Sequence, residues 1–377
     1  MLPNGWIACK IKDIQTVEVQ NGFSPMCVEY ATRRKSLSLG ALTGNSLDLT
    51  QEKFISEDCE MPSHSLLRKD DILVSRSNTK DKVGRAAVVT DEISNYYYPD
   101  LIMRFQVDAQ KADCRYVAMC LQSPAGRNYF MSHAAGTSTS MVKINKSVLE
   151  SFPLCLPPLE EQKKIAETLS TWDSAIEKME KLVECKEKIH AKLLNDCMHC
   201  ADWKISSIES VATVKKGIQL NGENMISNGS YYVMNGGVVP SGYTDEWNTP
   251  ENTVSISEGG NSCGFVAFND EKFWAGGHCY TLIDVSPEVL PKFLFHYLKN
   301  KEKEIMKLRV GSGLPNIQKD SITNFEFKYP TKKEQKNIVE ILDSSQKELS
   351  LLNQQLALYK KQKQGLMQKL LTGEWRI

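Results

Sequence analysis

One short motif occurs twice in this chain, and the repeat constrains the fold more than any other feature. Residues 157–165 read PPLEEQKKI, and residues 329–338 read YPTKKEQKNI. Glu161 and Glu334 lie 173 residues apart, and the same offset relates the isoleucines that end the two copies. The chain therefore contains two related units. Its length of 377 residues also favours two domains over one.

Apolar residues follow each copy of the motif at steps of three and four, which is the spacing of a heptad seam on one helix face. Each helix would run for about 40 residues, or roughly 60 Å. A seam of this kind needs a partner helix, and pseudo-two-fold symmetry would make the two helices an antiparallel coiled coil. His190 and Lys363 interrupt the seam at equivalent positions, as a registry device or as a solvated spot. The expected seam residues are Ile165, Leu169, Trp172, Ile176, Met179, Val183, Ile338, Leu342, Leu349, Leu352, Leu356 and Tyr359.

The ends of these helices carry recognisable signals. Pro158 suits the first turn of the first helix, and Thr331 with Glu334 predicts a capping box at the start of the second. Gly373 is a plausible stop for the second helix. Shortly after it, Trp375 repeats the tryptophan that opens each unit, so we expect the ends of the chain to lie together.

The two bodies, residues 1–155 and 201–328, have the pattern of an α/β (α+β) fold with many short strands. Each has two strand-like runs around a polar stretch, and a helix-like stretch near its end. The first unit is longer, which places the insertions in the first body. The expected strands are residues 71–75, 85–89, 253–257 and 264–268, and the expected helical stretches are 115–131 and 291–308.

Composition limits the possible functions. No apolar run approaches the ~20 residues that span a bilayer, and the first residues do not have the apolar core of a signal peptide. The 11 cysteines are interpreted as reduced thiols of a cytoplasmic protein. There are 46 basic and 46 acidic residues, so a role in DNA binding would need charge gathered on one side or a partner that supplies phosphate contacts.

Catalytic motifs are absent from the sequence. We find no phosphate-binding Gly-x-x-x-x-Gly-Lys loop, no Asn/Asp-Pro-Pro-aromatic methyltransferase motif, no nucleophile elbow and no His-Glu-x-x-His. Residues 197–200 read CMHC, a spacing that zinc sites also use, but Cys197 already occupies a seam position. We interpret it as a structural thiol and expect no metal site and no catalysis in this chain.

Two bodies, each followed by a long helix that begins Pro…Glu-Gln-Lys…Ile, resemble the specificity subunit of type I restriction–modification systems. The resemblance covers the whole chain. It is carried by residues 156–165, by their second copy at 329–338, and by the ending LLTG at 370–373. The pattern DILVS…GRAAV at residues 71–88 is also similar to a target-recognition domain of that family.

This resemblance implies a division of labour. Residues 1–155 and 201–328 would be target-recognition domains with twisted, mostly antiparallel sheets, each reading one half of a split double-stranded DNA target. Residues 156–200 and 329–377 would be spacer helices that set the gap and dock two methyltransferase subunits, with motor-nuclease subunits joining for cleavage. S-adenosylmethionine, ATP and Mg²⁺ would then be cofactors of the partners, and this chain would hold none.

Under that reading, each body must present hydrogen-bonding groups to base edges in the major groove. The polar stretch after the first strand run of each body provides them, with Arg76 suited to guanine and Asn78 to adenine. Further glycine- and serine-rich turns precede lysines and suit phosphate contacts. The candidate DNA-binding residues are Ser75, Arg76, Asn78, Lys80, Arg85, Ser138, Lys143, Asn235, Glu258, Asn261, Ser262, Ser312 and Lys319.

A second class of function remains open on the sequence alone. A duplicated adaptor, built on a helical hairpin and with no role in DNA binding, would also fit the balanced charge. Polar loops at equivalent places in both bodies argue against it. A self-contained restriction enzyme is disfavoured because no catalytic motif is found.

Overall fold

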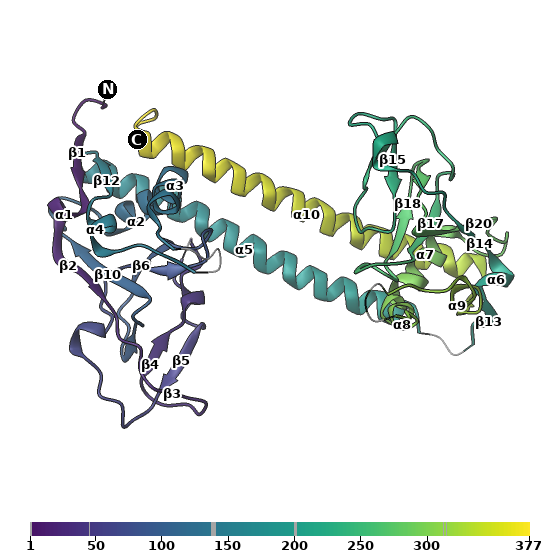
Figure 1. Cartoon of the computed structure of the whole chain (residues 1–377), viewed down its shortest axis with the longest axis horizontal. Coiled ribbons are helices and arrows are strands. Elements are labelled where there is room, and N and C mark those ends of the chain that lie inside the picture. Colours follow the sequence, from purple (N-terminus) through teal and green to yellow (C-terminus); the bar gives the residue numbers. More distant parts are fainter. Residues whose placement is uncertain (1, 45, 137–140, 200–201, 312, 314) are drawn as a thin grey trace. The chain divides into compact units, whose positions relative to one another are not determined.

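The structure is a computed structural model that describes residues 2–44, 46–136, 141–199, 202–311, 313 and 315–377. The chain divides into two compact units (Figure 1). The first unit holds residues 1–180 and 355–377, and the second holds residues 181–354. Each unit thus contains one body together with parts of two long helices.

The first body is built on a four-stranded antiparallel sheet in the order β2-β10-β6-β8. A second sheet, β3-β5-β4-β9, and two ribbons, β1-β12 and β11-β7, complete it. The strands are β1 (Ile7–Lys10), β2 (Gln15–Asn21), β3 (Cys27–Val28), β4 (Lys35–Leu37), β5 (Glu52–Ile55), β6 (Ile72–Ser75), β7 (Ser77–Asn78), β8 (Ala86–Val88), β9 (Tyr96–Tyr97), β10 (Ile102–Val107), β11 (Val142–Lys143) and β12 (Pro153–Leu156). The helices are α1 (Ile11–Ile14), η1 (Leu39–Ala41), η2 (Ser63–Ser65), α2 (Cys114–Gln122), α3 (Pro124–His133) and α4 (Lys146–Glu150).

The second body repeats this plan with fewer strands. Its main sheet is antiparallel in the order β14-β20-β17-β18, beside a three-stranded sheet β16-β15-β19 and a ribbon β13-β21. The strands are β13 (Lys204–Ser207), β14 (Thr213–Lys216), β15 (Tyr231–Met234), β16 (Gly242–Thr244), β17 (Thr253–Ser257), β18 (Val266–Asn269), β19 (Trp274–Ala275), β20 (Cys279–Ile283) and β21 (Glu326–Tyr329). The helices are α6 (Ile208–Val211), η3 (Gly222–Asn224), α7 (Pro291–Asn300), α8 (Glu302–Lys307) and α9 (Lys319–Thr323).

The predicted fold class is confirmed, because both bodies combine antiparallel sheets with helices. The four predicted strands correspond to β6, β8, β17 and β18. The two predicted helical stretches are each divided, which corrects the expectation of single helices. Ser123 caps α3 at its N-terminus and Pro124 follows it, so α2 cannot continue. In the second body, Lys301 separates α7 from α8.

The repeated motif starts two long helices, α5 (Leu159–Cys197, 39 residues) and α10 (Lys332–Thr372, 41 residues). Their contacts run antiparallel in each unit. In the first, Lys363 pairs with Asp173 and Lys360 with Glu180; in the second, Lys186 pairs with Glu348, and His190 lies beside Ser345. The twelve predicted seam residues all lie buried or half-buried. In the first unit, the Trp172 and Tyr359 rings meet edge to face with centroids 6.0 Å apart.

The glutamine of the repeated motif attaches each helix to its body. Gln162 Nε2 donates to the carbonyl oxygens of Pro157 (2.8 Å) and Lys111 (3.1 Å), and its Oε1 accepts from the Asp113 amide (3.0 Å). Its side chain is therefore fully used, and the residue is only 1% exposed. The motif contains a glutamine because this position needs both a donor and an acceptor.

The second copy makes the same three bonds. Gln335 Nε2 donates to Pro330 and Glu288 carbonyl oxygens, both at 2.9 Å, and its Oε1 accepts from the Leu290 amide at 2.8 Å. Gln335 is completely buried. The repeat in the sequence is thus a repeat of one buried hydrogen-bonded joint.

The neighbouring glutamates of the motif bind different partners. Glu334 accepts from the Trp203 indole nitrogen at 3.3 Å, and the Thr331 hydroxyl accepts from the Glu334 amide at 3.5 Å. The Thr331 half of the predicted capping box is therefore present, whereas the Glu334 carboxylate binds the indole. Glu161 instead holds the Arg376 guanidinium through both carboxylate oxygens, at 3.0 and 2.7 Å.

The segments near the two ends of the chain meet, as the repeated tryptophan predicts. Arg376 also donates to the Asn4 carbonyl oxygen at 2.8 Å. Gly373 has a φ of +73°, and a Cβ at this position would lie 2.4 Å from the Pro3 side chain. Glycine is therefore required where α10 ends, both for the left-handed backbone and for the close approach.

The two polar interruptions of the seam both have polar partners. His190 Nδ1 lies 2.9 Å from the Ser345 hydroxyl, and the Lys363 ammonium forms an ion pair with Asp173. Lys363 is buried, at 7% exposure. The two equivalent positions of the repeat, His190 and Lys363, thus each have a polar partner, which favours a registry role over a solvated spot.

None of the described helices combines the length and the apolar character needed to cross a membrane.

Candidate nucleic-acid interface

A polar turn follows one inner strand of each main sheet, β6 in the first body and β17 in the second, here called the central strands. The two turns have the same pattern of backbone hydrogen bonds. In the first body, the Ser75 amide donates to the Arg85 carbonyl (2.8 Å), and the Gly84 amide donates to the Ser75 carbonyl (2.8 Å). The strand β6 therefore ends at Ser75, and the chain leaves the sheet at Arg76.

The second body closes its turn in the same way. The Ser257 amide donates to the Phe265 carbonyl (2.9 Å), and the Gly264 amide donates to the Ser257 carbonyl (2.8 Å). Gly264 has a φ of +92°, and a Cβ there would lie 2.9 Å from Met306. Gly84 in the first body has a φ of +73°, so both turns need glycine where they return to the sheet.

The residue that follows each central strand is held by backbone bonds on both sides. The Arg76 amide donates to the Leu101 carbonyl at 2.8 Å, and its carbonyl accepts from the Ile144 amide at 2.9 Å. The Glu258 amide donates to the His278 carbonyl at 2.9 Å, and its carbonyl accepts from the Ile317 amide at 2.8 Å. Arg76 and Glu258 therefore occupy the same position of the shared fold, with side chains of opposite charge.

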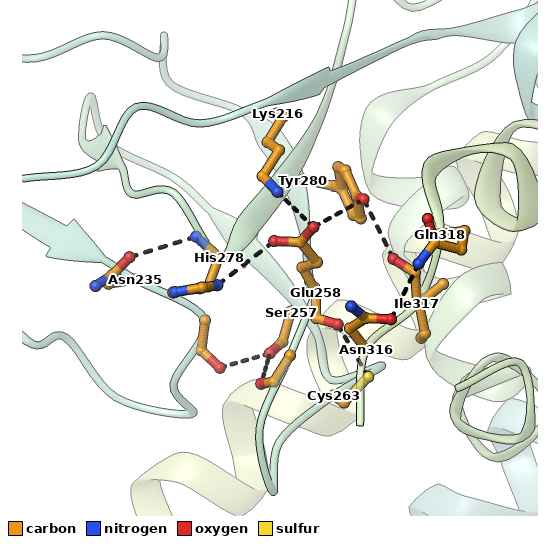
Figure 2. Close-up of polar contacts among 12 residues, drawn as sticks. Lys216, Asn235, Ser257, Glu258, Cys263, His278, Tyr280, Asn316, Ile317 and Gln318 are labelled. Carbon is orange, nitrogen blue, oxygen red and sulfur yellow. Dashed lines mark hydrogen bonds and ion pairs between the residues drawn. The ribbon is translucent and has the colours of Figure 1, made fainter. Parts of the chain in front are cut away.

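Strands β14 and β20 provide the side chains that hold Glu258 (Figure 2). The Lys216 ammonium donates to Glu258 Oε1 at 2.5 Å, and the Tyr280 hydroxyl donates to the same oxygen at 3.1 Å. Burial, and then the Glu258 carboxylate, raise the pKa of Tyr280 to about 12. The hydroxyl thus keeps its proton at neutral pH and remains a donor.

The second carboxylate oxygen of Glu258 is left open. Oε2 is buried and makes no hydrogen bond to any described residue. His278 Nδ1 lies 3.5 Å away, beyond ordinary hydrogen-bond distance, and its side chain is 64% exposed. Glu258 as a whole is only 9% exposed. A buried carboxylate with one unfilled oxygen is costly, so this oxygen calls for an explanation.

These side chains surround a hollow at the end of the sheet. Its volume is about 480 Å³, and residues from five separate segments of the second body line it. The lining residues are Lys216, Asn235, Glu258, Gly259, Gly260, His278, Pro315 and Asn316.

The equivalent site of the first body has different chemistry. Arg76 stands in place of Glu258 there; its Nη1 donates to the Asp100 carbonyl at 3.4 Å, and the residue is half-buried. By strand register, the counterparts of Lys216 and Tyr280 are Asn21 and Met103. The first body therefore has neither the carboxylate of Glu258 nor the lysine and tyrosine that donate to it in the second body.

The other candidates of the first body lie around the ribbon β7-β11. Lys143 pairs with Ser77 in that ribbon, next to Asn78, although the two strands are far apart in sequence. Asn78 Oδ1 accepts from the Thr79 amide at 2.9 Å. Lys80 and Lys143 are exposed and Arg85 is half-buried, whereas Ser75 is 1% exposed within β6. Ser138 lies outside the described residues.

In the second body, Asn235 and Ser262 are tied into the structure. Asn235 Oδ1 accepts from the His278 amide at 3.4 Å, and the Ser262 hydroxyl donates to the Gly236 carbonyl at 2.6 Å. Asn261 is exposed and its side chain makes no hydrogen bond to a described residue. Lys319 is exposed at the start of α9, and Ser312 lies outside the described residues.

Sequence reasoning missed the three side chains that surround Glu258, namely Lys216, His278 and Tyr280. Lys216 and Tyr280 lie on strands β14 and β20, and His278 directly precedes β20, so their approach to Glu258 is set by the pairing of the sheet and spacing along the chain does not reveal it. It also missed the part played by Gln162 and Gln335, although their repeat at the offset of the motif was a visible signal.

No group of three or more His, Cys, Asp or Glu side chains that could hold a metal ion occurs among the described residues. Of the CMHC stretch, His199 Nδ1 lies 3.2 Å from the Asn195 carbonyl oxygen, and Cys200 is outside the described part of the chain.

Comparison with known proteins identifies the family to which this chain belongs. Residues 43–187 and 201–358 match the family described as type I restriction modification DNA specificity domain. The two matches together cover more than half of the chain and one falls on each body. The protein therefore belongs to this family.

Curated relatives are named as type I specificity subunits. A putative type I specificity subunit of Mycoplasma genitalium is 34% identical over 139 residues, 37% of this chain and 36% of the relative. One from Mycoplasma pneumoniae is 37% identical over 119 residues, 31% of this chain and 32% of the relative. The match thus spans about a third of the length of these relatives. A putative type I restriction enzyme specificity subunit of Methanocaldococcus jannaschii aligns over 100% of this chain and 95% of its own length, at 22% identity.

Solved structures show the same fold. The crystal structure of a type I restriction-modification system S subunit from M. genitalium has a TM-score of 0.69 over 98% of both chains, at 17% identity. A second chain, from work on complex assembly and conformational transition of the type I R-M system, has a TM-score of 0.55 over 100% of both chains, at 13% identity.

Proposed function

We propose that this chain is the DNA-specificity subunit of a type I restriction–modification complex and is not itself an enzyme. Each body reads one half of a split double-stranded target. The observation that carries this proposal is the pair of equivalent strand-end sites, one in each body, with the same backbone bonds and different polar side chains at Arg76 and Glu258.

The chemistry of the two sites supports reading of bases. Arg76 supplies donors of the kind that pair with guanine O6 and N7, and Glu258 supplies an acceptor of the kind that pairs with an amino group. A protein adaptor would have no need for two polar turns held in the same frame. Membership of the DNA specificity family points the same way.

The two long helices have a separate task in this proposal. Each contributes residues to both units, and the glutamine joints fix each one to a body. At about 1.5 Å per residue, helices of 39 and 41 residues are about 60 Å long. They set the gap between the half-sites, and they dock two methyltransferase subunits, which motor-nuclease subunits join for cleavage.

Catalysis and cofactors then belong to the partners. S-adenosylmethionine, ATP and Mg²⁺ bind the methyltransferase and motor-nuclease subunits, in the cytoplasm. With 46 basic and 46 acidic residues, this chain relies on its partners for much of the phosphate contact.

A gel-shift experiment tests the proposal. The chain alone should bind random duplex weakly at physiological salt, and the co-purified complex with its methyltransferase should bind more tightly and methylate adenine in both halves of one split motif. Tight, specific binding by the isolated chain would contradict the reliance on partners. If the complex has no preference for any sequence, the adaptor function is correct instead.

A further inference from the structure

The Glu258 site of the second body is only half filled, and this is the feature that carries a further inference. An ionised carboxylate only accepts hydrogen bonds, and its two oxygens offer about four lone-pair positions. Oε1 accepts from Lys216 and Tyr280, whereas Oε2 accepts from no described residue. The missing partner must therefore be a donor.

His278 covers the open oxygen without satisfying it. Its Nδ1 lies 3.5 Å from Oε2, and its side chain is 64% exposed at the rim of the hollow. A side chain that exposed can change rotamer at small cost. The ring can therefore turn aside when a better donor enters the hollow.

Base edges in the major groove divide into two kinds at the relevant position. Cytosine and adenine present an exocyclic amino group, which donates, while guanine and thymine present a keto oxygen, which accepts. Only an amino group satisfies a carboxylate oxygen, and a keto oxygen would face it with like partial charge. We infer that Glu258 selects a base with an exocyclic amino group, cytosine or adenine, at one position of the half-site read by the second body. This inference rests on the proposed function and assigns it a specificity-determining residue.

Lys216 balances the negative charge that Glu258 would bring close to the DNA phosphates. An uncompensated anion would be repelled by the phosphates, but the Lys216 ammonium lies 2.5 Å from Oε1 and its side chain is 51% exposed. The charge of Glu258 is therefore balanced within the site, and its acceptor oxygen remains for the base.

The first body carries the opposite chemistry at the same position. The guanidinium of Arg76 offers donors only, so it selects a base with acceptors, above all guanine. The shared frame thus lets one side chain decide between amino and keto chemistry in each body.

A charge-removing substitution tests the inference directly. In the Glu258→Gln variant, the donors Lys216 and Tyr280 hold the amide oxygen at the position of Oε1, which places the amide NH₂ at the position of Oε2. The variant therefore presents a donor instead of an acceptor. The preference at one position should turn from cytosine or adenine to guanine or thymine, by about tenfold or more.

The measurement uses the chain in complex with its co-purified methyltransferase, on a duplex library randomised at each position of both half-sites. The matched control is Glu271→Gln, which removes an exposed carboxylate of the same body outside the site. It should leave every preference unchanged. The first half-site should stay the same in both variants.

A second arm needs no variant. With the unaltered complex, each cytosine or adenine of the second half-site, apart from the adenine that is itself methylated, is replaced in turn by an analogue that lacks the exocyclic amino group. One replacement should reduce methylation about tenfold or more, and it identifies which of the two bases is read. It should have little further effect in the Glu258→Gln complex, because the same contact is already lost.

The inference is overturned if Glu258→Gln leaves every preference in the second half-site unchanged, or if no amino-group removal reduces methylation there. Both results would leave the proposed function intact as long as the complex still methylates a split motif. If the variant does not fold, the analogue arm on the unaltered complex decides the question by itself.

Discussion

Two kinds of region occur twice in this molecule, and they repeat in different ways. At the helix starts, Gln162 and Gln335 make the same three hydrogen bonds. At the strand ends, the backbone bonds repeat but the side chains are Arg76 and Glu258. The helix starts thus repeat the same side-chain hydrogen bonds, whereas the strand ends repeat only backbone hydrogen bonds.

The difference follows from what each side chain binds. Both glutamines bind backbone groups, which are the same in any sequence, so one residue type serves in both copies. The side chains of Arg76 and Glu258 take no part in the repeated backbone bonds, and Glu258 lines the hollow of the second body. Variation at this position therefore costs the fold little, and under the proposed function it would let the two bodies read different bases on one scaffold.

The first prediction separates the joints and helices from the sites and has the largest expected effect. Four residues inserted after Val183, with a matched insertion after the equivalent Leu356, lengthen both helices by about 6 Å and nearly restore the seam register. The preferred gap should grow by about one or two base pairs, while the bases within each half-site stay the same. Methylation of a library of targets with varied gaps measures both.

A variant that still prefers the original gap would show that the helices do not set it. Altered bases within a half-site would show instead that the strand-end sites depend on the helices.

The second prediction tests whether the two joints are equivalent. Gln162→Ala and Gln335→Ala each leave one buried and two part-buried backbone groups without their partner, so each should lower the free energy of unfolding by about 3 kcal/mol. The control is Gln346→Ala on the exposed face of α10, with a change near zero. Urea denaturation followed by tryptophan fluorescence gives the values. A large loss at only one glutamine would mean that the joints differ in strength despite their equal bonds.

The third prediction tests whether the sites act one by one. Arg76→Ala should weaken discrimination by about 1–3 kcal/mol within the half-site of the first body, and Asn261→Ala should act only on the other half. Arg76 loses a donor pair, and Asn261 is an exposed side chain on the turn that follows Glu258. Methylation of a base-randomised library reports each position separately. An effect of either variant on both halves would contradict a body for each half-site.

The smallest expected effect concerns pH and the second unit alone. Burial lowers the pKa of His296, although the nearby Asp343 carboxylate, 2.8 Å from its Nε2, acts in the opposite direction. The unfolded chain binds a proton on this residue near pH 6.5, and the folded chain binds it only at lower pH. Stability should therefore fall by less than about 1.4 kcal/mol between pH 7 and pH 5.5.

His296→Gln should flatten that pH dependence without abolishing it, because burial also lowers the pKa of His190. Asp113 and Leu290 are equivalent, because the amide of each donates to the glutamine of its joint. Counting six residues on from each shows that Met119 is the equivalent of His296 in the first body. A matched Met119→Gln variant should leave the pH dependence unchanged. A dependence that is the same with and without His296 would exclude this residue as its source.

Much of the architecture could be predicted because it depends on regular spacing of residues along the chain. A heptad seam and a motif repeated at one offset are properties of the chain itself, and they predict two long helices and two related bodies. The division of the helical stretches at Ser123 and Lys301 was missed, because apolar spacing continues across both breaks. A cap and a proline decide the break at Ser123 locally, whereas Lys301 makes no side-chain cap.

The strand-end sites could be predicted only in part. Arg76 and Glu258 stand directly after apolar runs, and their polar character in that place was a visible signal. The Lys216, His278 and Tyr280 side chains join Glu258 only because β14, β17 and β20 pair side by side. Pairing of distant strands depends on the register of the whole sheet, which no short window of the sequence contains.

The sequence by itself thus determined the repeat, the helices and the family resemblance, because these depend on spacing and residue type along the chain. Only the tertiary structure decided that Arg76 and Glu258 are equivalent, since their alignment rests on hydrogen bonds to segments far away in sequence. It also decided that one oxygen of Glu258 is unfilled, because burial and the filling of a carboxylate depend on every strand that surrounds it.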